Sequence, residues 1–168
     1  MQVKNSSEGI KEYISNLKEE IGMVGFIGLG IMGKPMARNL LKAGVELMVN
    51  DVNRSVVEEL AAEGAKAAAR QEIGAACDVV FTILPNGAIV QDVLFGGDGV
   101  AASLKAGAIV CDCSSVTPTE SHTCADKLAE AGVGFVDAPV SGGEPGAVNG
   151  TLAFMAGGAQ KDFDALKP

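Results

Sequence analysis

Apolar residues gather into short continuous runs along the chain, and segments with apolar residues at helical spacing separate these runs. The runs predict strands at residues 23–27, 45–50, 66–69, 79–84, 108–112, 134–140 and 152–156, and the periodic segments predict helices at residues 32–43, 55–63, 88–95, 118–131 and 161–166. Strands that are apolar throughout are typical of a sheet covered on both faces, and strand–helix alternation requires parallel pairing with right-handed crossovers. The pattern therefore predicts an α/β fold with a Rossmann-type, doubly wound, mostly parallel sheet.

Residues 1–22 do not follow this alternation. Apolar side chains recur there at helical spacing, at Ile10, Tyr13, Ile14, Leu17 and Ile21. Ser6 or Ser7 is a suitable N-cap for such a helix, which is too short to be stable unless it docks on a partner surface. We expect residues 1–22 to be a helical extension lying on a domain formed by residues 23–168, with a partner-binding helix as the alternative.

The composition narrows the classes of partner. A chain of 168 residues is long enough for one domain with a real core. Its net charge of −8 disfavours nucleic acid, because an acidic surface repels phosphate backbones. The sequence has neither an apolar run of the roughly 18 residues that a membrane span needs nor the apolar core of a signal peptide. We therefore expect no nucleic acid or membrane partner and a cytoplasmic location.

The four cysteines, Cys77, Cys111, Cys113 and Cys124, are expected to be buried free thiols in a reducing compartment. Cys111 and Cys113 flank Asp112 inside an expected strand, which places both thiols on one face of the sheet. Zinc sites use a wider spacing that is carried on a turn, so we predict no metal site.

The turn after the first expected strand carries the clearest chemical signal. Gly28, Gly30 and Gly33 form a GxGxxG pattern between that strand and the following helix, the context in which this pattern binds dinucleotides. Gly28 permits the tight turn, Gly30 lets a pyrophosphate approach the backbone, and Gly33 lets the helix pack close to the strand. The N–H groups at the start of the helix then face the phosphates.

A second motif overlaps this turn. Residues 28–34 also match the beginning of a P-loop, GxxxxGK. Pro35 stands where a serine or threonine would bind magnesium, and proline has no hydroxyl. Hydrolysis of a nucleoside triphosphate is therefore a poor interpretation.

The end of the second expected strand indicates which dinucleotide is bound. Asp51 lies 18 residues beyond Gly33, close to the spacing of about 20 at which an acidic residue binds the adenosine ribose. A carboxylate there accepts hydrogen bonds from the ribose hydroxyls of NAD and repels the 2′-phosphate of NADP. Val52 supplies no cation for that phosphate, although Arg54 is nearby. NAD is the expected cofactor, and NADP is less favoured.

Residues 26–40, FIGLGIMGKPMARNL, resemble the signature of the β-hydroxyacid dehydrogenases, a family that includes 3-hydroxyisobutyrate dehydrogenase and tartronate semialdehyde reductase. Further segments follow in the family's order: LPN at 84–86, DCSSVTP at 112–118, DAPVSGG at 137–143, and then GA at 146–147 and GTL at 150–152. The resemblance extends from about residue 23 to residue 168 and does not include residues 1–22.

The resemblance implies roles for individual residues. The cofactor would contact the whole turn, the loop after the fourth strand and one serine: Gly28, Leu29, Gly30, Ile31, Met32, Gly33, Asp51, Leu84, Pro85, Asn86 and Ser115. The resemblance also implies that Ser115 lies beside both nicotinamide and substrate. Ser141, Gly142 and Gly143 would hold the substrate carboxylate with a hydroxyl and backbone N–H groups.

The chain departs from the family in lacking its general acid/base. In the family this group is a lysine on a helix of a second, all-helical domain, beyond the position that corresponds to the end of this sequence. Lys161 and Lys167 come too early, Tyr13 lies in the extension, and His122 lies inside an expected helix. No catalytic residue is assigned, and we expect the sequence to be the cofactor half of a longer enzyme without its all-helical domain.

The first functional hypothesis is an NAD-binding domain of an oxidoreductase that interconverts a β-hydroxyacid and its semialdehyde, with the chain alone inactive. Its partner would be that small substrate. Apolar surface left by the absent domain would also favour self-association as a homo-oligomer. The alternative is a non-catalytic module that binds NAD or a protein partner.

Overall fold

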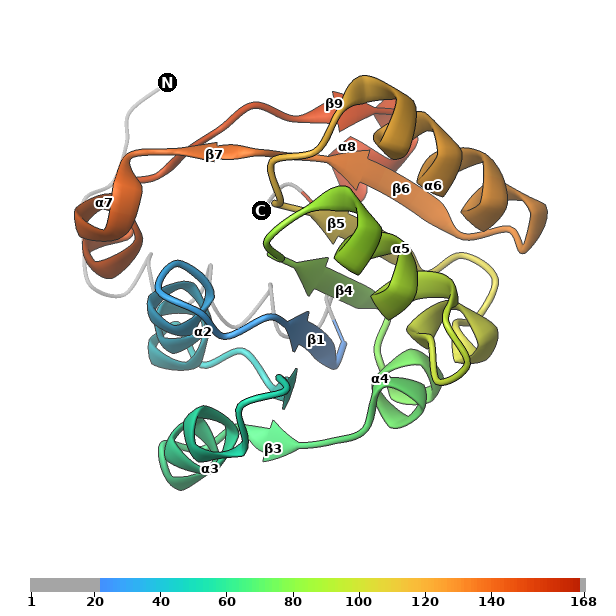
Figure 1. Ribbon diagram of the computed structural model, residues 1–168. Helices are drawn as coiled ribbons and strands as arrows, with labels where there is room; N and C mark the ends of the chain where they lie inside the picture. Colours follow the sequence, from blue (N-terminus) through green and yellow to red (C-terminus); the bar gives the residue numbers. More distant parts are fainter. Residues whose placement is uncertain (1–21, 167–168) are drawn as a thin grey trace, which may run out of the picture.

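The computed structural model describes residues 22–166, so the expected helix within residues 1–22 lies outside the described part (Figure 1). The main sheet has the strand order β3-β2-β1-β4-β5-β6-β9. Its parallel strands are β1 (Val24–Ile27), β2 (Leu47–Asn50), β3 (Lys66–Ala67), β4 (Val79–Thr82), β5 (Ile109–Asp112) and β6 (Gly134–Asp137). The predicted doubly wound, mostly parallel α/β fold is therefore confirmed.

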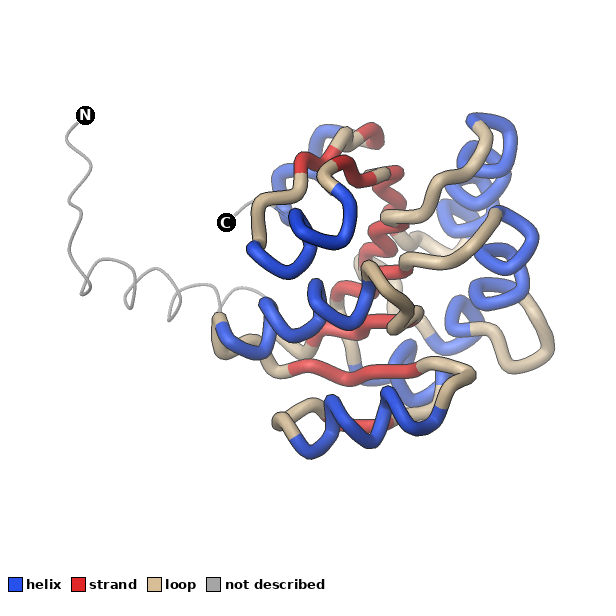
Figure 2. The backbone as a smooth tube through the Cα atoms, turned by 60° about the vertical axis from the view of Figure 1, so that its left-hand side comes forward, coloured by secondary structure: helices blue, strands red, loops and turns tan. Residues whose placement is uncertain are grey.

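Helices cover both faces of this sheet (Figure 2). The helices are α2 (Gly33–Lys42), α3 (Arg54–Ala62), α4 (Arg70–Ala76), α5 (Gly87–Phe95), α6 (Pro118–Glu130), α7 (Gly143–Asn149), α8 (Gln160–Leu166) and the short 3-10 helix η1 (Val100–Ser103). One core packs under α2, α3 and α7, and a second packs under α4, α5 and α6. Adjacent strand residues alternate between the two cores, as Phe26 and Ile27 do.

The cysteines are divided between these cores. Cys111 and Cys113 belong to the first core, and Cys77 and Cys124 belong to the second. All four are buried and none forms a disulfide, in agreement with the prediction. Desolvation raises the pKa of the Cys77 and Cys124 thiols to about 11, so neither is a reactive thiolate at neutral pH.

Two expected strands are wrong in extent or in partner. The strand expected at 134–140 ends at Asp137, and β7 (Val140–Ser141) begins after Pro139, which has no N–H to donate to a ladder. The strand expected at 152–156 is only β8 (Ala153–Phe154), which pairs antiparallel with β7 in a separate two-stranded sheet. The edge strand β9 (Gly157–Gly158) was not expected and runs antiparallel to β6.

Helices α4 and α7 were not expected from the sequence. Helix α4 is one of the shortest, and the side chain of Glu72 closes its first turn by accepting a hydrogen bond from the backbone N–H of Ala69 at 2.7 Å. Helix α7 contains two glycines and a proline, which are poor helix formers. It is held from outside, since Asn39 on α2 donates a hydrogen bond to the carbonyl of Ala147 at 2.7 Å.

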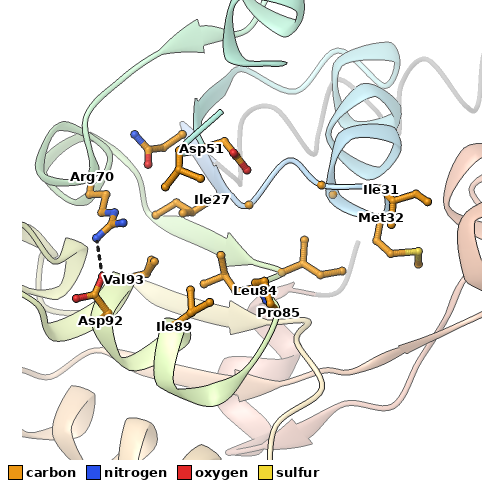
Figure 3. A pocket seen from close by; sticks show the side chains of 16 residues that line it. Ile27, Ile31, Met32, Asp51, Arg70, Leu84, Pro85, Ile89, Asp92 and Val93 are labelled. Carbon is orange, nitrogen blue, oxygen red and sulfur yellow. Dashed lines mark hydrogen bonds and ion pairs between the residues drawn. The ribbon is translucent and has the colours of Figure 1, made fainter. Parts of the chain in front are cut away.

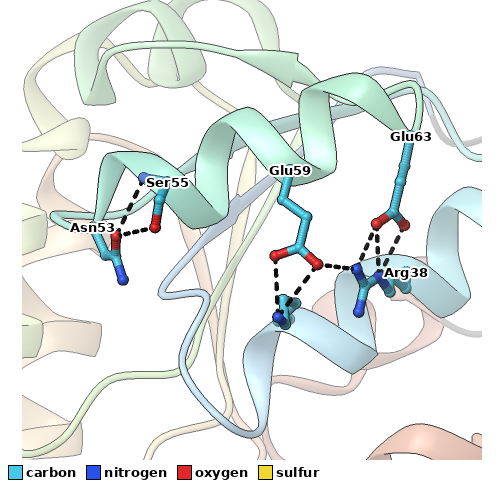
Figure 4. A network of polar contacts seen from close by, with 6 residues as sticks. Arg38, Asn53, Ser55, Glu59 and Glu63 are labelled. Atoms are coloured by element: carbon cyan, nitrogen blue, oxygen red, sulfur yellow. Dashed lines mark hydrogen bonds and ion pairs between the residues drawn. The ribbon is translucent and has the colours of Figure 1, made fainter.

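An ion-pair network joins α2 to α3 (Figure 4). The Nε–H of Arg38 is shared between the two carboxylate oxygens of Glu63, at 2.9 and 2.8 Å, and Arg38 also pairs with Glu59. Lys34 reaches Glu59 at 3.1 Å. Exposed pairs of this kind contribute little to stability, but they join α3 to α2 along one side of the sheet.

A buried polar network joins the carboxyl ends of β4 and β5. Asp112 is fully buried, and its Oδ1 accepts hydrogen bonds from the Thr82 hydroxyl at 2.8 Å and from the Ser114 backbone N–H at 3.1 Å. The Ser114 hydroxyl also donates to Asp112 and accepts from the N–H of Leu84 at 2.8 Å. The loop after β4 is therefore anchored to the end of β5 through one carboxylate.

That carboxylate is incompletely satisfied. Oδ2 of Asp112 and Oδ1 of Asp137, which are paired in register on β5 and β6, are both buried without a hydrogen-bond partner among the described residues. Burial raises the pKa of Asp112, against the lowering effect of its hydrogen bonds from Ser114 and Thr82, and the nearby Asp137 adds to the increase.

Among residues 22–166, no helix is both long and apolar enough to cross a bilayer.

We predict that Asp112 makes the protein less stable as the pH rises. A carboxyl group whose pKa is higher in the folded chain keeps its proton there over a pH range where the unfolded chain has lost it. The free energy of unfolding therefore falls as the pH increases above 3.8, the ordinary value, by up to about 1.4 kcal/mol per pH unit. In Asp112→Asn, the amide keeps an acceptor for Thr82 and has no charge, so this part of the slope should disappear.

Urea unfolding between about pH 4 and about pH 8 measures the slope. Asp126→Asn, which removes an exposed carboxylate on α6, is the matched control and should leave the slope close to that of the unaltered chain. The same slope in Asp112→Asn as in the unaltered chain would contradict this account of Asp112.

Candidate functional site

A cavity of about 690 Å³ opens at the carboxyl ends of the strands where the strand order reverses, between β1 and β4 (Figure 3). Crevices at this point of an open α/β sheet are where such folds bind ligands. The lining residues are Ile27, Gly28, Gly30, Ile31, Met32, Gly33, Asn50, Asp51, Val52, Arg70, Ile83, Leu84, Pro85, Ile89, Asp92 and Val93. The lining thus combines apolar side chains, a glycine turn and a few charged groups.

The three glycines of the turn have three different surroundings. Gly28 has a φ of +98°, which favours glycine, and a Cβ there would collide with the carbonyl oxygen of Ile83. A Cβ at Gly33 would overlap the carbonyl oxygen of Gly28, so α2 approaches the end of β1 as closely as backbone allows. A Cβ at Gly30 would meet no atom within 4 Å. The first and third glycines are required by the fold, whereas the second borders open space.

The start of α2 faces this open space. Met32 stands at the N-cap and makes no side-chain hydrogen bond to the helix, and the first turn contains no acidic residue. In the first turn the Lys34 N–H donates to the Gly30 carbonyl at 3.0 Å and Pro35 has no N–H, so the Gly33 N–H and the partial positive charge of the helix start are available to an anion at this end of the cavity. The residues present fit a pyrophosphate beside Gly30.

Asp51 follows β2 on the same side of the cavity. Its Oδ2 accepts a hydrogen bond from the backbone N–H of Leu29 at 2.6 Å, and its Oδ1 accepts one from the N–H of Asn53 at 2.7 Å. The carboxylate is thereby held against the glycine turn, and each oxygen keeps a lone pair for a ligand hydroxyl. Leu29 itself is buried and does not line the cavity.

The loop after β4 forms the opposite wall. Leu84 and Pro85 line the cavity, and the N–H of Leu84 is held by Ser114 as described above. Asn86 does not line the cavity, because its side chain caps α5 by accepting a hydrogen bond from the N–H of Ile89 at 3.0 Å. The structure thus brings together eight of the expected cofactor residues, namely Gly28, Gly30, Ile31, Met32, Gly33, Asp51, Leu84 and Pro85.

The residues expected to bind substrate lie outside this cavity. Ser115 is exposed on the loop after β5, and Ser141, Gly142 and Gly143 are exposed around β7 and the start of α7. These segments follow β5 and β6, whose carboxyl ends lie at the same edge of the sheet as those of β1 and β4. These four residues therefore lie at the same edge of the sheet as the cavity, but they do not line it.

Two side chains considered for proton transfer, His122 and Lys161, belong to the part of the chain that the structure describes. His122 is exposed on α6 and Lys161 is exposed on α8, and neither lines the cavity. Within residues 22–166, no group of three or more histidine, cysteine, aspartate or glutamate side chains could hold a metal ion.

Two charged residues that line the cavity, Arg70 and Asp92, were not predicted from the sequence. Arg54, which the sequence placed near the ribose site, does not line the cavity.

Known proteins similar to this chain match it over the described domain. The chain is 47% identical over 146 residues to 2-(hydroxymethyl)glutarate dehydrogenase of Eubacterium barkeri, covering 86% of this chain and 48% of that enzyme. It is 42% identical over 146 residues to 2-hydroxy-3-oxopropionate reductase of Escherichia coli, covering 86% of this chain and 50% of the relative. The chain thus spans about half the length of these relatives.

A solved structure agrees with these matches. The crystal structure of 3-hydroxyisobutyrate dehydrogenase from Salmonella typhimurium superposes with a TM-score of 0.82 at 37% identity, covering 87% of this chain and 51% of that one. The relatives are enzymes of the 3-hydroxyisobutyrate dehydrogenase and tartronate semialdehyde reductase type, as the sequence resemblance predicted, and the match covers their N-terminal domain. The family model for the NAD-binding domain of 6-phosphogluconate dehydrogenase matches residues 23–168, and the chain belongs to this family.

Proposed function

We propose that this chain is the cofactor half of an oxidoreductase that transfers a hydride between NAD and a β-hydroxyacid or its semialdehyde. The proposal rests on one observation: the glycine turn, the start of α2 and Asp51 line the same cavity, and a hydrogen bond links Asp51 to the turn. The similar enzymes are named for substrates with a hydroxymethyl or aldehyde carbon beside the carbon that bears a carboxylate.

Different residues of the cavity would contact different parts of NAD, which supplies or accepts the hydride when bound. The open space at Gly30, the Gly33 N–H and the partial positive charge at the start of α2 would take the pyrophosphate. Asp51 would accept hydrogen bonds from the ribose hydroxyls. Leu84 and Pro85 would form an apolar wall that excludes water from one side of the cofactor.

Substrate binding falls to the loops after β5 and β6. Ser115 would stand beside the reacting carbon, and the Ser141 hydroxyl with the N–H groups of Gly142 and Gly143 would orient the substrate carboxylate. The two glycines have φ values of +132° and +59°, which turn their N–H groups in directions that other residues rarely adopt. A serine hydroxyl and two N–H groups suit a carboxylate, because all three can donate.

Proton transfer to the carbonyl oxygen needs a further group. The ionisable side chains on the cavity are Asp51, Arg70 and Asp92, and the lining residues include no histidine, lysine or tyrosine, which are common proton donors in such a step. This observation favours a second candidate function, NAD binding without catalysis, for the chain by itself. The whole enzyme would draw its general acid from residues beyond the described domain.

We predict that the chain prefers NADH to NADPH and that Asp51→Asn reduces this preference. The amide has the shape of the carboxylate but no charge to repel a 2′-phosphate. Loss of charged hydrogen bonds should weaken NADH binding by roughly tenfold or more. Calorimetric titration with both cofactors measures the ratio. Equal affinity of the unaltered chain for NADH and NADPH would overturn the role of Asp51.

We predict that Gly30→Val leaves the chain folded but impairs NADH binding. The new Cβ would meet no atom within 4 Å, and the side chain would occupy the space proposed for the pyrophosphate. Gly33→Ala is the matched comparison: its Cβ collides with the Gly28 carbonyl, so its melting temperature should fall. Undiminished NADH fluorescence enhancement in a folded Gly30→Val variant would show that the turn does not bind the cofactor.

We predict that the 168-residue chain binds NADH yet turns over tartronate semialdehyde or methylmalonate semialdehyde very slowly. General acid–base catalysis contributes about 10²- to 10⁴-fold, and an incomplete substrate site costs a further factor in orientation. NADH oxidation at saturating cofactor is the measurement. Turnover near 10 per second, roughly that of an ordinary enzyme, would mean that a residue of this chain, such as His122 or Lys161, supplies the proton.

A further inference from the structure

The end of the cavity remote from the glycine turn carries a charged pair that the assigned roles leave unused. Arg70 at the start of α4 and Asp92 on α5 lie at one end, Ile31 and Met32 lie at the other, and Asp51 lies between them (Figure 3). The glycine turn suits the pyrophosphate of NAD, and Asp51 suits the adenosine ribose next to it. The adenine base, attached to the other side of that ribose, would then extend to the end of the cavity that holds Arg70 and Asp92.

Two ion pairs hold the Arg70 guanidinium in place, but they do not use all of its hydrogen-bond donors. Its Nη1 contacts Oδ2 of Asp92 at 3.4 Å and Oδ1 of Asp98 at 3.1 Å. The side chain of Arg70 is only 14% exposed, against 66% for Asp92. Both ion pairs use Nη1, which leaves the N–H groups of Nε and Nη2 for an acceptor on a ligand. Oδ1 of Asp92 is likewise left for a donor.

The walls beside this pair are apolar. Val52, Ile89 and Val93 line the cavity, and Val52 and Ile89 are 90% and 38% exposed. A slot with apolar walls and a polar end suits a flat aromatic ring whose faces are apolar and whose edge carries hydrogen-bonding groups. A purine base has this character.

The donors and acceptors match adenine in particular. Its 6-amino group is a donor, and the ring nitrogen on either side of that group is an acceptor. We propose that Arg70 and Asp92 recognise the edge of adenine: Asp92 accepts a hydrogen bond from the 6-amino group, and Arg70 donates one to the adjacent ring nitrogen. The inference rests on the binding of NAD and makes these two side chains specificity-determining residues for the base.

Asp98 has a different part in this arrangement. It contacts the same Nη1 atom of Arg70, yet it does not line the cavity. Asp98 is therefore a positioning residue, and Asp92 is the carboxylate that meets the base. The two residues give a pair of variants with the same change in charge and with different expected results.

The test is a calorimetric titration of the chain with NAD⁺ and with the analogue that carries hypoxanthine in place of adenine. The analogue has a carbonyl oxygen where adenine has its amino group, so it presents an acceptor to Asp92. We expect the unaltered chain to bind NAD⁺ about tenfold or more tightly than the analogue. In Asp92→Asn this ratio should fall toward one, because the amide can donate to the carbonyl, and in Asp98→Asn it should stay near the unaltered value.

Two results would overturn the proposal: equal affinity of the unaltered chain for the two dinucleotides, or equal changes of the ratio in Asp92→Asn and Asp98→Asn. The comparison of two ligands on the unaltered chain needs no variant to fold, and melting temperatures check the variants. Because the readout is a ratio of affinities, it is independent of whether the chain catalyses hydride transfer, so a failure of the proposed reaction would be seen separately in the turnover assay.

Discussion

The close approach of α2 to the end of β1 determines the position of every other group in the cofactor site. The backbone of Gly33 lies against the carbonyl of Gly28 with no room for a Cβ. This contact aims the start of α2 at the cavity and draws the turn across the end of β4, where Gly28 meets Ile83. A larger residue at either position would move the helix outward and separate its N–H groups from the space beside Gly30. The cavity therefore depends on contact between backbones rather than on any one side chain.

The second requirement is that the loops around the cavity stay in register with one another. Two carboxylates provide this: Asp51 links the turn after β1 to the end of β2, and Asp112 links the ends of β4 and β5. Asp51 is partly accessible and keeps capacity for a ligand, whereas Asp112 is fully buried and one of its oxygens has no hydrogen-bond partner among residues 22–166. Burying a carboxylate in this way is costly, and the hydrogen bonds from Thr82 and Ser114 compensate for part of that cost.

The sequence predicted features that depend on local chemistry. The glycine turn and Asp51 were predicted from their spacing along one strand–helix–strand unit, and both line the cavity. Helix α7 was missed because its glycines and proline oppose a helix, and a contact with α2, far away in the sequence, helps to hold it. Arg70 was missed since it is separated from Asp51 by the whole of α3 and β3, and nothing in the pattern shows that both reach one cavity. The partnership of Asp112 with Thr82 and Asp137 depends on strand register, which a single sequence does not display.

The hydrogen bonds of Asp51 have a consequence for how the cofactor arrives. Both carboxylate oxygens accept backbone N–H groups of the protein itself, from Leu29 in the turn and from Asn53 beyond β2. The turn is therefore preorganised, and association requires little ordering of the protein. Entry of the dinucleotide should be a single encounter limited by diffusion and orientation, with the lifetime of the complex, rather than its rate of formation, accounting for differences in affinity among variants.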